Sequence, residues 1–113
     1  MYTPTTLRRS SPAKIRKAVE RVVRQWQPVK VIQFGSNAQP GGLDDEVHLL
    51  VIMERCPDKR SMIADILDEL GDAGFSKEIL VATVEELQGE PNLGSIVPVA
   101  VKEGKVLYDR TPG

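Results

Sequence analysis

Cysteine and histidine are almost missing from this sequence, which holds Cys56 and His48 as its only examples. With one cysteine, neither an internal disulfide nor a zinc site built from several cysteines can form. Aromatic residues make up only 4% of the chain, and none lies among the basic residues between Arg8 and Arg24. Proteins that bind single-stranded nucleic acid usually place aromatic side chains among their basic ones. The composition therefore excludes a disulfide framework and disfavours single-strand binding.

Long apolar runs are missing as well. No stretch approaches the roughly 18 apolar residues that a membrane-spanning helix needs, and residues 1–4 lack the apolar core of a secretory signal. The chain is 41% hydrophobic and 27% charged, a balance typical of globular proteins. We expect a flexible arm over residues 1–10, a single domain over residues 11–113, a cytoplasmic location and no membrane partner.

The net charge of −1 hides an uneven distribution. Residues 1–30 carry eight basic side chains and one acid, Glu20, which gives this segment about +7 and the rest of the chain about −8. A basic segment can bind nucleic acid or an acidic partner, or it can be the solvated face of a helix that packs near acidic neighbours. The missing aromatic residues favour the solvated face, and nucleic-acid binding stays the less favoured alternative.

The apolar patterns predict helices and strands in alternation. A first helix should begin at Pro12, capped by Ser10 or Ser11, and end near Gln27. Thr83 and Glu86 have the spacing of a capping box, which would begin a short helix. Further helices are expected at 58–73 and, despite Pro98, at 92–102, and strands at 29–34, 47–53, 78–82 and 105–108. The fold class is predicted to be α/β (α+β), with a mixed β-sheet of about four strands backed by helices.

Gly35 and Ser36 come directly after the first expected strand. Ligands of α/β proteins bind where buried strands end, and a glycine there lets the backbone approach a phosphate. Ser36 could donate both its hydroxyl and its amide hydrogen to such a group. A Gly-Ser pair is also common in plain turns, so this pair predicts phosphate binding only together with other signals.

The second strand supplies such a signal. The strand period places Glu46 and His48 on one face, and Glu78 on a neighbouring strand could reach the same point. Two-metal phosphoryl transfer needs anionic oxygen ligands that bridge divalent cations, and here the middle ligand would be a histidine. Two plainer interpretations stay open: His48 as a hydrogen-bonding partner and Glu78 as a surface charge.

These segments together resemble the minimal nucleotidyltransferase family, within the DNA polymerase β-like superfamily. That family has an apolar strand ending in Gly-Ser, a loop, Asp-x-Asp leading into a second strand, and a third acid on a later strand. The corresponding segments here are 31–36 (VIQFGS), 46–51 (EVHLLV), 78–83 (EILVAT) and 101–108 (VKEGKVLY). The resemblance covers about residues 12–110 and rests on the order of the motifs.

The resemblance implies a site and a reaction. Gly35 and Ser36 would bind a nucleoside triphosphate, and Glu46, His48 and Glu78 would hold Mg²⁺ or Mn²⁺ and act in catalysis. The reaction would transfer a nucleoside monophosphate to a hydroxyl group on a protein, a nucleic acid or a small molecule. Family members of this size are commonly encoded with a small helical partner, often of the HEPN type, as an antitoxin or as half of a two-subunit enzyme. A homodimer is the other expected assembly.

The departures from the family pattern all fall on this chemistry. Glu46 and His48 stand where the family has two aspartates, Glu78 stands for the third, and residues 37–40 lack the usual arginine. A neutral imidazole in place of a carboxylate removes one negative charge from the site, and imidazole is a poor ligand for Mg²⁺. Two alternatives stay open: Asp44 could pair with Glu46 after a register shift of two residues, or His48 and Glu46 could hold a softer metal such as manganese or zinc.

The sequence therefore predicts a nucleotidyltransferase-like protein with an eroded metal site, which acts by binding, such as the antitoxin-like half of a two-subunit system. An active, metal-dependent nucleotidyltransferase is the first alternative. A nucleic-acid-binding module that uses the basic first helix is the second alternative.

Overall fold

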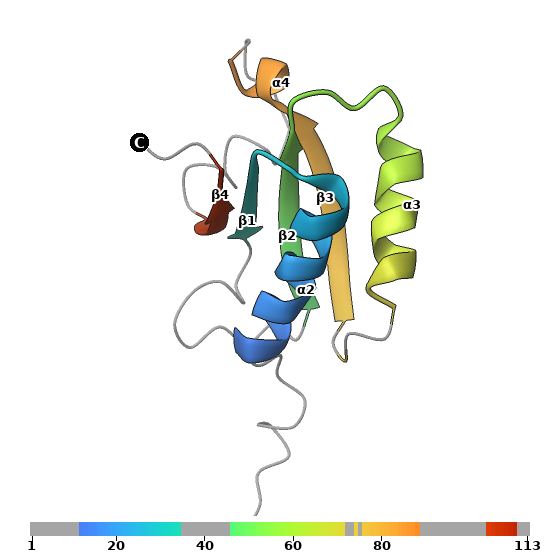
Figure 1. The fold of residues 1–113 in the computed structure, drawn as a ribbon, viewed down its shortest axis with the longest axis vertical. Coiled ribbons are helices and arrows are strands. Elements are labelled where there is room, and N and C mark those ends of the chain that lie inside the picture. The colour runs from blue at the N-terminus through green and yellow to red at the C-terminus, as the bar shows by residue number, and fades with distance from the viewer. Residues whose placement is uncertain (1–11, 35–45, 72–73, 75, 89–103, 111–113) are drawn as a thin grey trace, which may run out of the picture.

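The computed structural model describes residues 12–34, 46–71, 74, 76–88 and 104–110, which form one four-stranded sheet with three helices (Figure 1). The helices are α2 (Pro12–Trp26), α3 (Lys59–Glu69) and α4 (Val84–Gln88), and the strands are β1 (Lys30–Phe34), β2 (Glu46–Met53), β3 (Ser76–Thr83) and β4 (Lys105–Asp109). The strand order is β3-β2-β1-β4. β2 and β3 run parallel, whereas β1 is antiparallel to both of its neighbours. The predicted α+β class with a mixed four-stranded sheet is confirmed.

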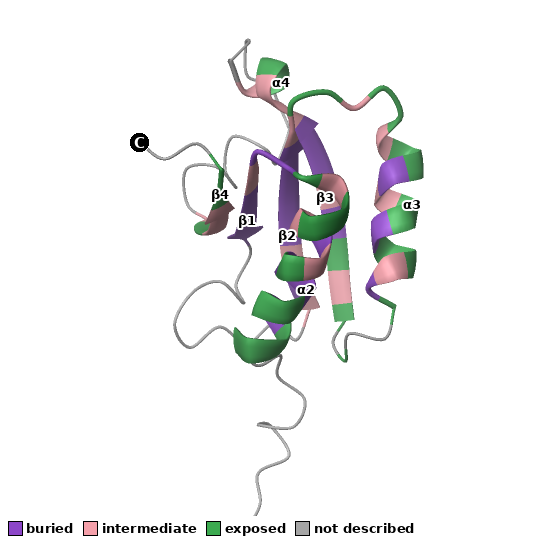
Figure 2. Cartoon of the chain, viewed as in Figure 1, coloured by how far each residue is buried: buried purple, intermediate pink, exposed green. Residues whose placement is uncertain are grey.

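The two faces of the sheet carry separate clusters of apolar side chains, because side chains alternate along each strand. On one face, α2 and α3 pack against Val31, Val47, Leu49, Val51, Ile79 and Val81. On the other face, Val29, Ile32, Phe34, Leu50, Ile52 and Ala82 form a second cluster, to which α4 adds Val84 and Leu87. The central strands are consequently buried on both sides (Figure 2).

Helix α2 has the amphipathic pattern that the sequence predicts. Ile15, Ala18, Val19 and Val22 are buried against the sheet, at the spacing of one helical face. Trp26, in the last turn, is half-buried and packs against the edge of the same cluster. The helix ends at Trp26, one residue before the predicted position, and Gln27 follows with a φ of 52°. Pro28 comes next and cannot continue a helix.

Helix α3 is shorter than the predicted span of 58–73. Asp58 is its N-cap, because the carboxylate accepts a hydrogen bond from the Ser61 backbone N–H at 3.0 Å. The C-cap is Leu70, whose side chain is fully buried. Gly71 and Gly74 follow the helix, and Gly74 has the positive φ of 90° that glycine tolerates.

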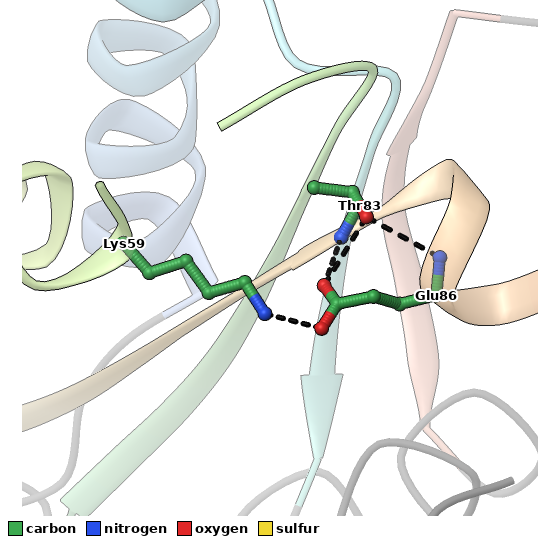
Figure 3. Close-up of polar contacts among 3 residues, drawn as sticks. All are labelled: Lys59, Thr83 and Glu86. Carbon is green, nitrogen blue, oxygen red and sulfur yellow. Dashed lines mark hydrogen bonds and ion pairs between the residues drawn. The ribbon is translucent and has the colours of Figure 1, made fainter. Parts of the chain in front are cut away.

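Helix α4 begins with the predicted capping box (Figure 3). The Glu86 backbone N–H donates to the Thr83 hydroxyl at 3.3 Å, and the Thr83 backbone N–H donates to the Glu86 carboxylate at 2.8 Å. Lys59 of α3 forms an ion pair with the same carboxylate. The cap therefore joins the end of β3, the start of α4 and the first turn of α3.

Strand β4, which the sequence predicts at 105–108, lies at the edge of the sheet, and its pairing with β1 is interrupted by a bulge. Ile32 pairs with Val106 and Val31 pairs with Tyr108, so Leu107 is the additional residue. Leu107 and Tyr108 both pack against the cluster beneath α2. The bulge thus directs two consecutive side chains of β4 towards α2.

Several predictions concern residues outside the described ranges. These are the arm at 1–10, the Gly-Ser turn and the loop up to Asp45, and the helix at 92–102. Among the helices that the structure describes, none combines the length and the apolar character needed to cross a membrane.

Candidate functional site

The three predicted metal ligands come together on the second face of the sheet. Glu46 and His48 are two residues apart on β2, and their side chains lie on the same face as Leu50 and Ile52. Glu78 of β3 lies directly opposite His48 in the parallel pairing of the two strands. Strand register alone therefore brings the three side chains to one end of the β2–β3 pair.

The imidazole of His48 lies between the two carboxylates. Its Nε2 is 3.3 Å from Glu46 Oε1, and its Nδ1 is 3.7 Å from Glu78 Oε1. One possible ligand atom from each residue lies within 4.8 Å of the others. The His48 side chain is 19% exposed, against 43% for Glu46 and 52% for Glu78. The cluster is thus a surface group with its histidine at the inner position.

Phe34 adds a neighbour that the sequence motif did not indicate. It is the last residue of β1 and the register partner of His48, and the two rings meet edge to face at a centroid distance of 5.3 Å and an interplanar angle of 80°. This contact fixes the orientation of the imidazole from the β1 side. The sequence did hold a signal for this neighbour. Side chains alternate along β1, which places Ile32 and Phe34 on the same face of the sheet as His48.

The chemistry of the donor set does not fit a pair of magnesium ions. Two Mg²⁺ ions bridged to phosphate need several anionic oxygen ligands, and this cluster offers two carboxylates. Its central donor is an imidazole, which suits Zn²⁺ or Mn²⁺ better than Mg²⁺. Donor atoms of a single zinc ion lie roughly 4 Å apart at most, so small side-chain rotations would bring all three into range. By their chemistry, these three residues could hold one softer cation.

Gly35, Ser36 and the substitute ligand Asp44 lie outside the described residues. Gly35 follows Phe34 in the chain, and Phe34 pairs with His48. The described part of the site is therefore the Glu46, His48 and Glu78 cluster together with Phe34.

The sequence matches neither a protein-family model nor a curated protein. The arrangement of the cluster therefore carries the functional argument, together with the order of the sequence motifs.

The basic first helix has acidic neighbours. The Arg21 guanidinium donates to the Glu69 carboxylate of α3, with Nε and a terminal nitrogen at 3.3 Å and 3.1 Å from Oε2. It also donates to the Glu69 backbone carbonyl. Lys30 lies 3.7 Å from Asp109 in the neighbouring strand. Part of the positive charge of residues 1–30 is thus paired with acidic side chains. This agrees with the interpretation of a solvated helix that packs near acidic neighbours.

Proposed function

We propose that this chain is a minimal-nucleotidyltransferase-like protein whose metal site is eroded and which acts by binding. The position of His48 carries the proposal. A nucleotidyltransferase of this kind needs an anionic ligand between the flanking acids, and this chain has an imidazole there, in contact with both. Without that charge, the site holds divalent cations against a triphosphate weakly, and transfer of a nucleotide is correspondingly slow.

The order of the elements supports the proposed likeness to minimal nucleotidyltransferases. An apolar strand, β1, leads into Gly35 and Ser36, the next strand begins with Glu46 and His48, and the third contributes Glu78 beside them. In the family that the sequence resembles, these positions carry the catalytic acids. An arrangement of this kind that carries a histidine in place of the middle acid is what we expect of a pseudoenzyme.

Calorimetry of nucleoside triphosphate binding tests the proposal. The native chain and Glu46→Ala are titrated with ATP and GTP, first with Mg²⁺ and then with Mn²⁺, and Glu85→Ala serves as the matched control because Glu85 is exposed on α4. We expect no magnesium-dependent binding by any of the three. Magnesium-dependent binding that Glu46→Ala abolishes and Glu85→Ala retains would overturn the proposal.

A restored variant separates erosion from a wrong resemblance. Glu46→Asp combined with His48→Asp supplies the two aspartates of the family pattern. If the eroded ligands are the cause of inactivity, the double variant gains magnesium-dependent triphosphate binding. If the folded double variant stays inert, Gln39→Arg is added to restore the arginine that residues 37–40 lack, and inertness of this triple variant as well would overturn the resemblance to nucleotidyltransferases.

An active enzyme remains the second candidate, because three donors from two strands converge within 4.8 Å. In this alternative a single Mn²⁺ or Zn²⁺ is held by Glu46, His48 and Glu78, and a nucleoside monophosphate is transferred to a hydroxyl group. Manganese-dependent triphosphate binding by the native chain, lost in Glu46→Ala, would favour this candidate over the inert one.

The partner and the location belong to the same proposal. The family resemblance supports a small helical protein of the HEPN type as partner in the cytoplasm, with a homodimer as the alternative assembly. Nucleic acid is the less favoured partner, since Arg21 and Lys30 pair with acids of the chain itself. Affinity for DNA or RNA that falls steeply with salt would reverse this order.

A further inference from the structure

A cavity of about 860 Å³ lies between α2 and β4. One stripe of α2 lines it at helical spacing, from Pro12 through Ile15, Val19 and Val23 to Arg24. The opposite wall is residues 105–108 of β4. Its floor includes Gln33, which alternates with Ile32 and Phe34 and therefore faces α2. The cavity is on the other face of the sheet from the cluster around His48.

Gln33 gives this cavity a polar group at depth. It is the buried polar residue of the described core and is 5% exposed. A glutamine amide offers an acceptor oxygen and two donor hydrogens, and burying such a group among apolar side chains costs free energy unless it is hydrogen-bonded. A ligand that reaches the floor of the cavity changes the surroundings of this amide, which makes Gln33 a reporter of occupancy.

The rim of the cavity is positively charged. Among the described residues that border it, Arg16, Arg24 and Lys105 are exposed bases and Glu20 is the single acid. Between rim and floor, the walls are apolar side chains, namely Ile15, Val19, Val23 and Leu107. The half-buried Tyr108 adds a phenol ring beside them. An apolar wall beneath a basic rim complements a molecule that combines an apolar body with one negative charge.

We propose that the cavity between α2 and β4 binds a small organic carboxylate with an apolar body. The volume lies within the range of roughly 300–1,000 Å³ typical of small-molecule sites. The carboxylate lies near Arg16, Arg24 and Lys105, and the apolar body packs between α2 and Leu107. The bulge in β4 shapes this wall, because it directs Leu107 and Tyr108 to the same side.

Two-dimensional ¹⁵N nuclear magnetic resonance with octanoate as the probe tests the proposal. We expect saturable shifts of the Gln33 side-chain amide and of the backbone amides of Ile15, Val19 and Leu107. The backbone amide resonances of His48 and Glu78, whose side chains lie on the other face of the sheet, should not shift. Octanol has the same chain without the charge, and it should bind several-fold more weakly than octanoate.

Matched charge reversals locate the carboxylate. Arg16→Glu and Lys17→Glu change the charge of α2 equally at adjacent exposed positions, but only Arg16 borders the cavity. Arg16→Glu should weaken octanoate binding about fivefold or more, and Lys17→Glu by less than about twofold.

Three results would overturn the proposal. The first is octanoate shifts that do not saturate or that are spread over both faces of the sheet. The second is equal binding of octanoate and octanol, which would exclude a carboxylate site. The third is shifts of the same resonances with rising protein concentration alone, which would assign the cavity to a second copy of the chain.

Discussion

His48 and Glu78 face each other across the parallel strands β2 and β3, with Nδ1 of the imidazole 3.7 Å from Oε1 of the carboxylate. Glu46 approaches the other ring nitrogen at 3.3 Å. The imidazole lies between the two carboxylates, so it separates two groups that would otherwise repel each other. The same residue that weakens a magnesium site thus supports the pairing of β2 with β3.

Replacement of His48 by aspartate should make the stability of the folded chain depend on a divalent cation. His48→Asp gathers three carboxylates at one end of β2 and β3, and their repulsion should destabilise the chain by about 1 kcal/mol in chelator. Millimolar Mg²⁺ should restore the melting temperature, because a ligand that binds only the folded state stabilises it. Thermal unfolding with EDTA and with MgCl₂ measures both effects.

His48→Asn is the control for this prediction, since it removes the imidazole without adding a charge. Its melting temperature should not respond to Mg²⁺. If His48→Asp and His48→Asn melt together under both conditions, the three side chains do not act as one electrostatic group.

Adjacent residues of α3 should differ sharply in their contribution to stability. Ile66 is fully buried between α3 and the sheet, whereas Leu67 is 38% exposed. Ile66→Ala removes buried methyl groups and leaves a cavity, so it should cost about 2–5 kcal/mol of unfolding free energy. Leu67→Ala should cost less than about 1 kcal/mol. Urea denaturation measures both, and similar losses would contradict the packing of α3 described above.

The capping box of α4 should give the chain an acid-sensitive component of stability. The hydrogen bond from Lys59, assisted by the Thr83 backbone N–H, holds the pKa of Glu86 below its ordinary value of 4.5. The carboxylate therefore stabilises the folded state fully above about pH 4.5, and this contribution is lost as the pH falls through the lowered pKa. The Glu86 side chain is 46% exposed, so solvent screening keeps the contribution below about 1 kcal/mol.

Glu86→Gln measures this component. The stability difference between the native chain and Glu86→Gln should be largest near neutral pH and should shrink in acid, as followed by urea denaturation from pH 3 to pH 7. Glu85→Gln, one residue earlier on the exposed side of α4, should show no such convergence. If the difference in unfolding free energy between the native chain and Glu86→Gln stays constant across this pH range, ionisation of Glu86 does not stabilise the cap.

The sequence predicted the regular elements well where one physical signal dominated. The apolar run at 47–53 predicted β2, and the strand period with the register of β3 accounts for the convergence of Glu46, His48 and Glu78. The end of α3 was placed too late, at residue 73, whereas the helix has its C-cap at Leu70, whose buried side chain is a tertiary contact that no local pattern indicates. The cavity beside Gln33 depends on the bulge in β4, which no local pattern indicates.

The junction between α2 and β1 contains a position that glycine should improve. Gln27 has a φ of 52°, in the left-handed region that L-residues other than glycine, asparagine and aspartate rarely adopt. Its backbone N–H donates to the Val23 carbonyl at 2.9 Å, and its carbonyl accepts from the Arg110 side chain at 3.3 Å. Both interactions use backbone atoms, so Gln27→Gly keeps them while removing the steric cost at the end of α2.

We expect Gln27→Gly to stabilise the chain by about 0.5–1 kcal/mol in urea denaturation. Gln27→Val should destabilise it by a similar amount or more, because a β-branched side chain is least tolerated there. Gln25→Gly, two residues earlier within the helix, should instead cost about 1 kcal/mol, so a loss of stability at both positions would show that α2 continues through Gln27.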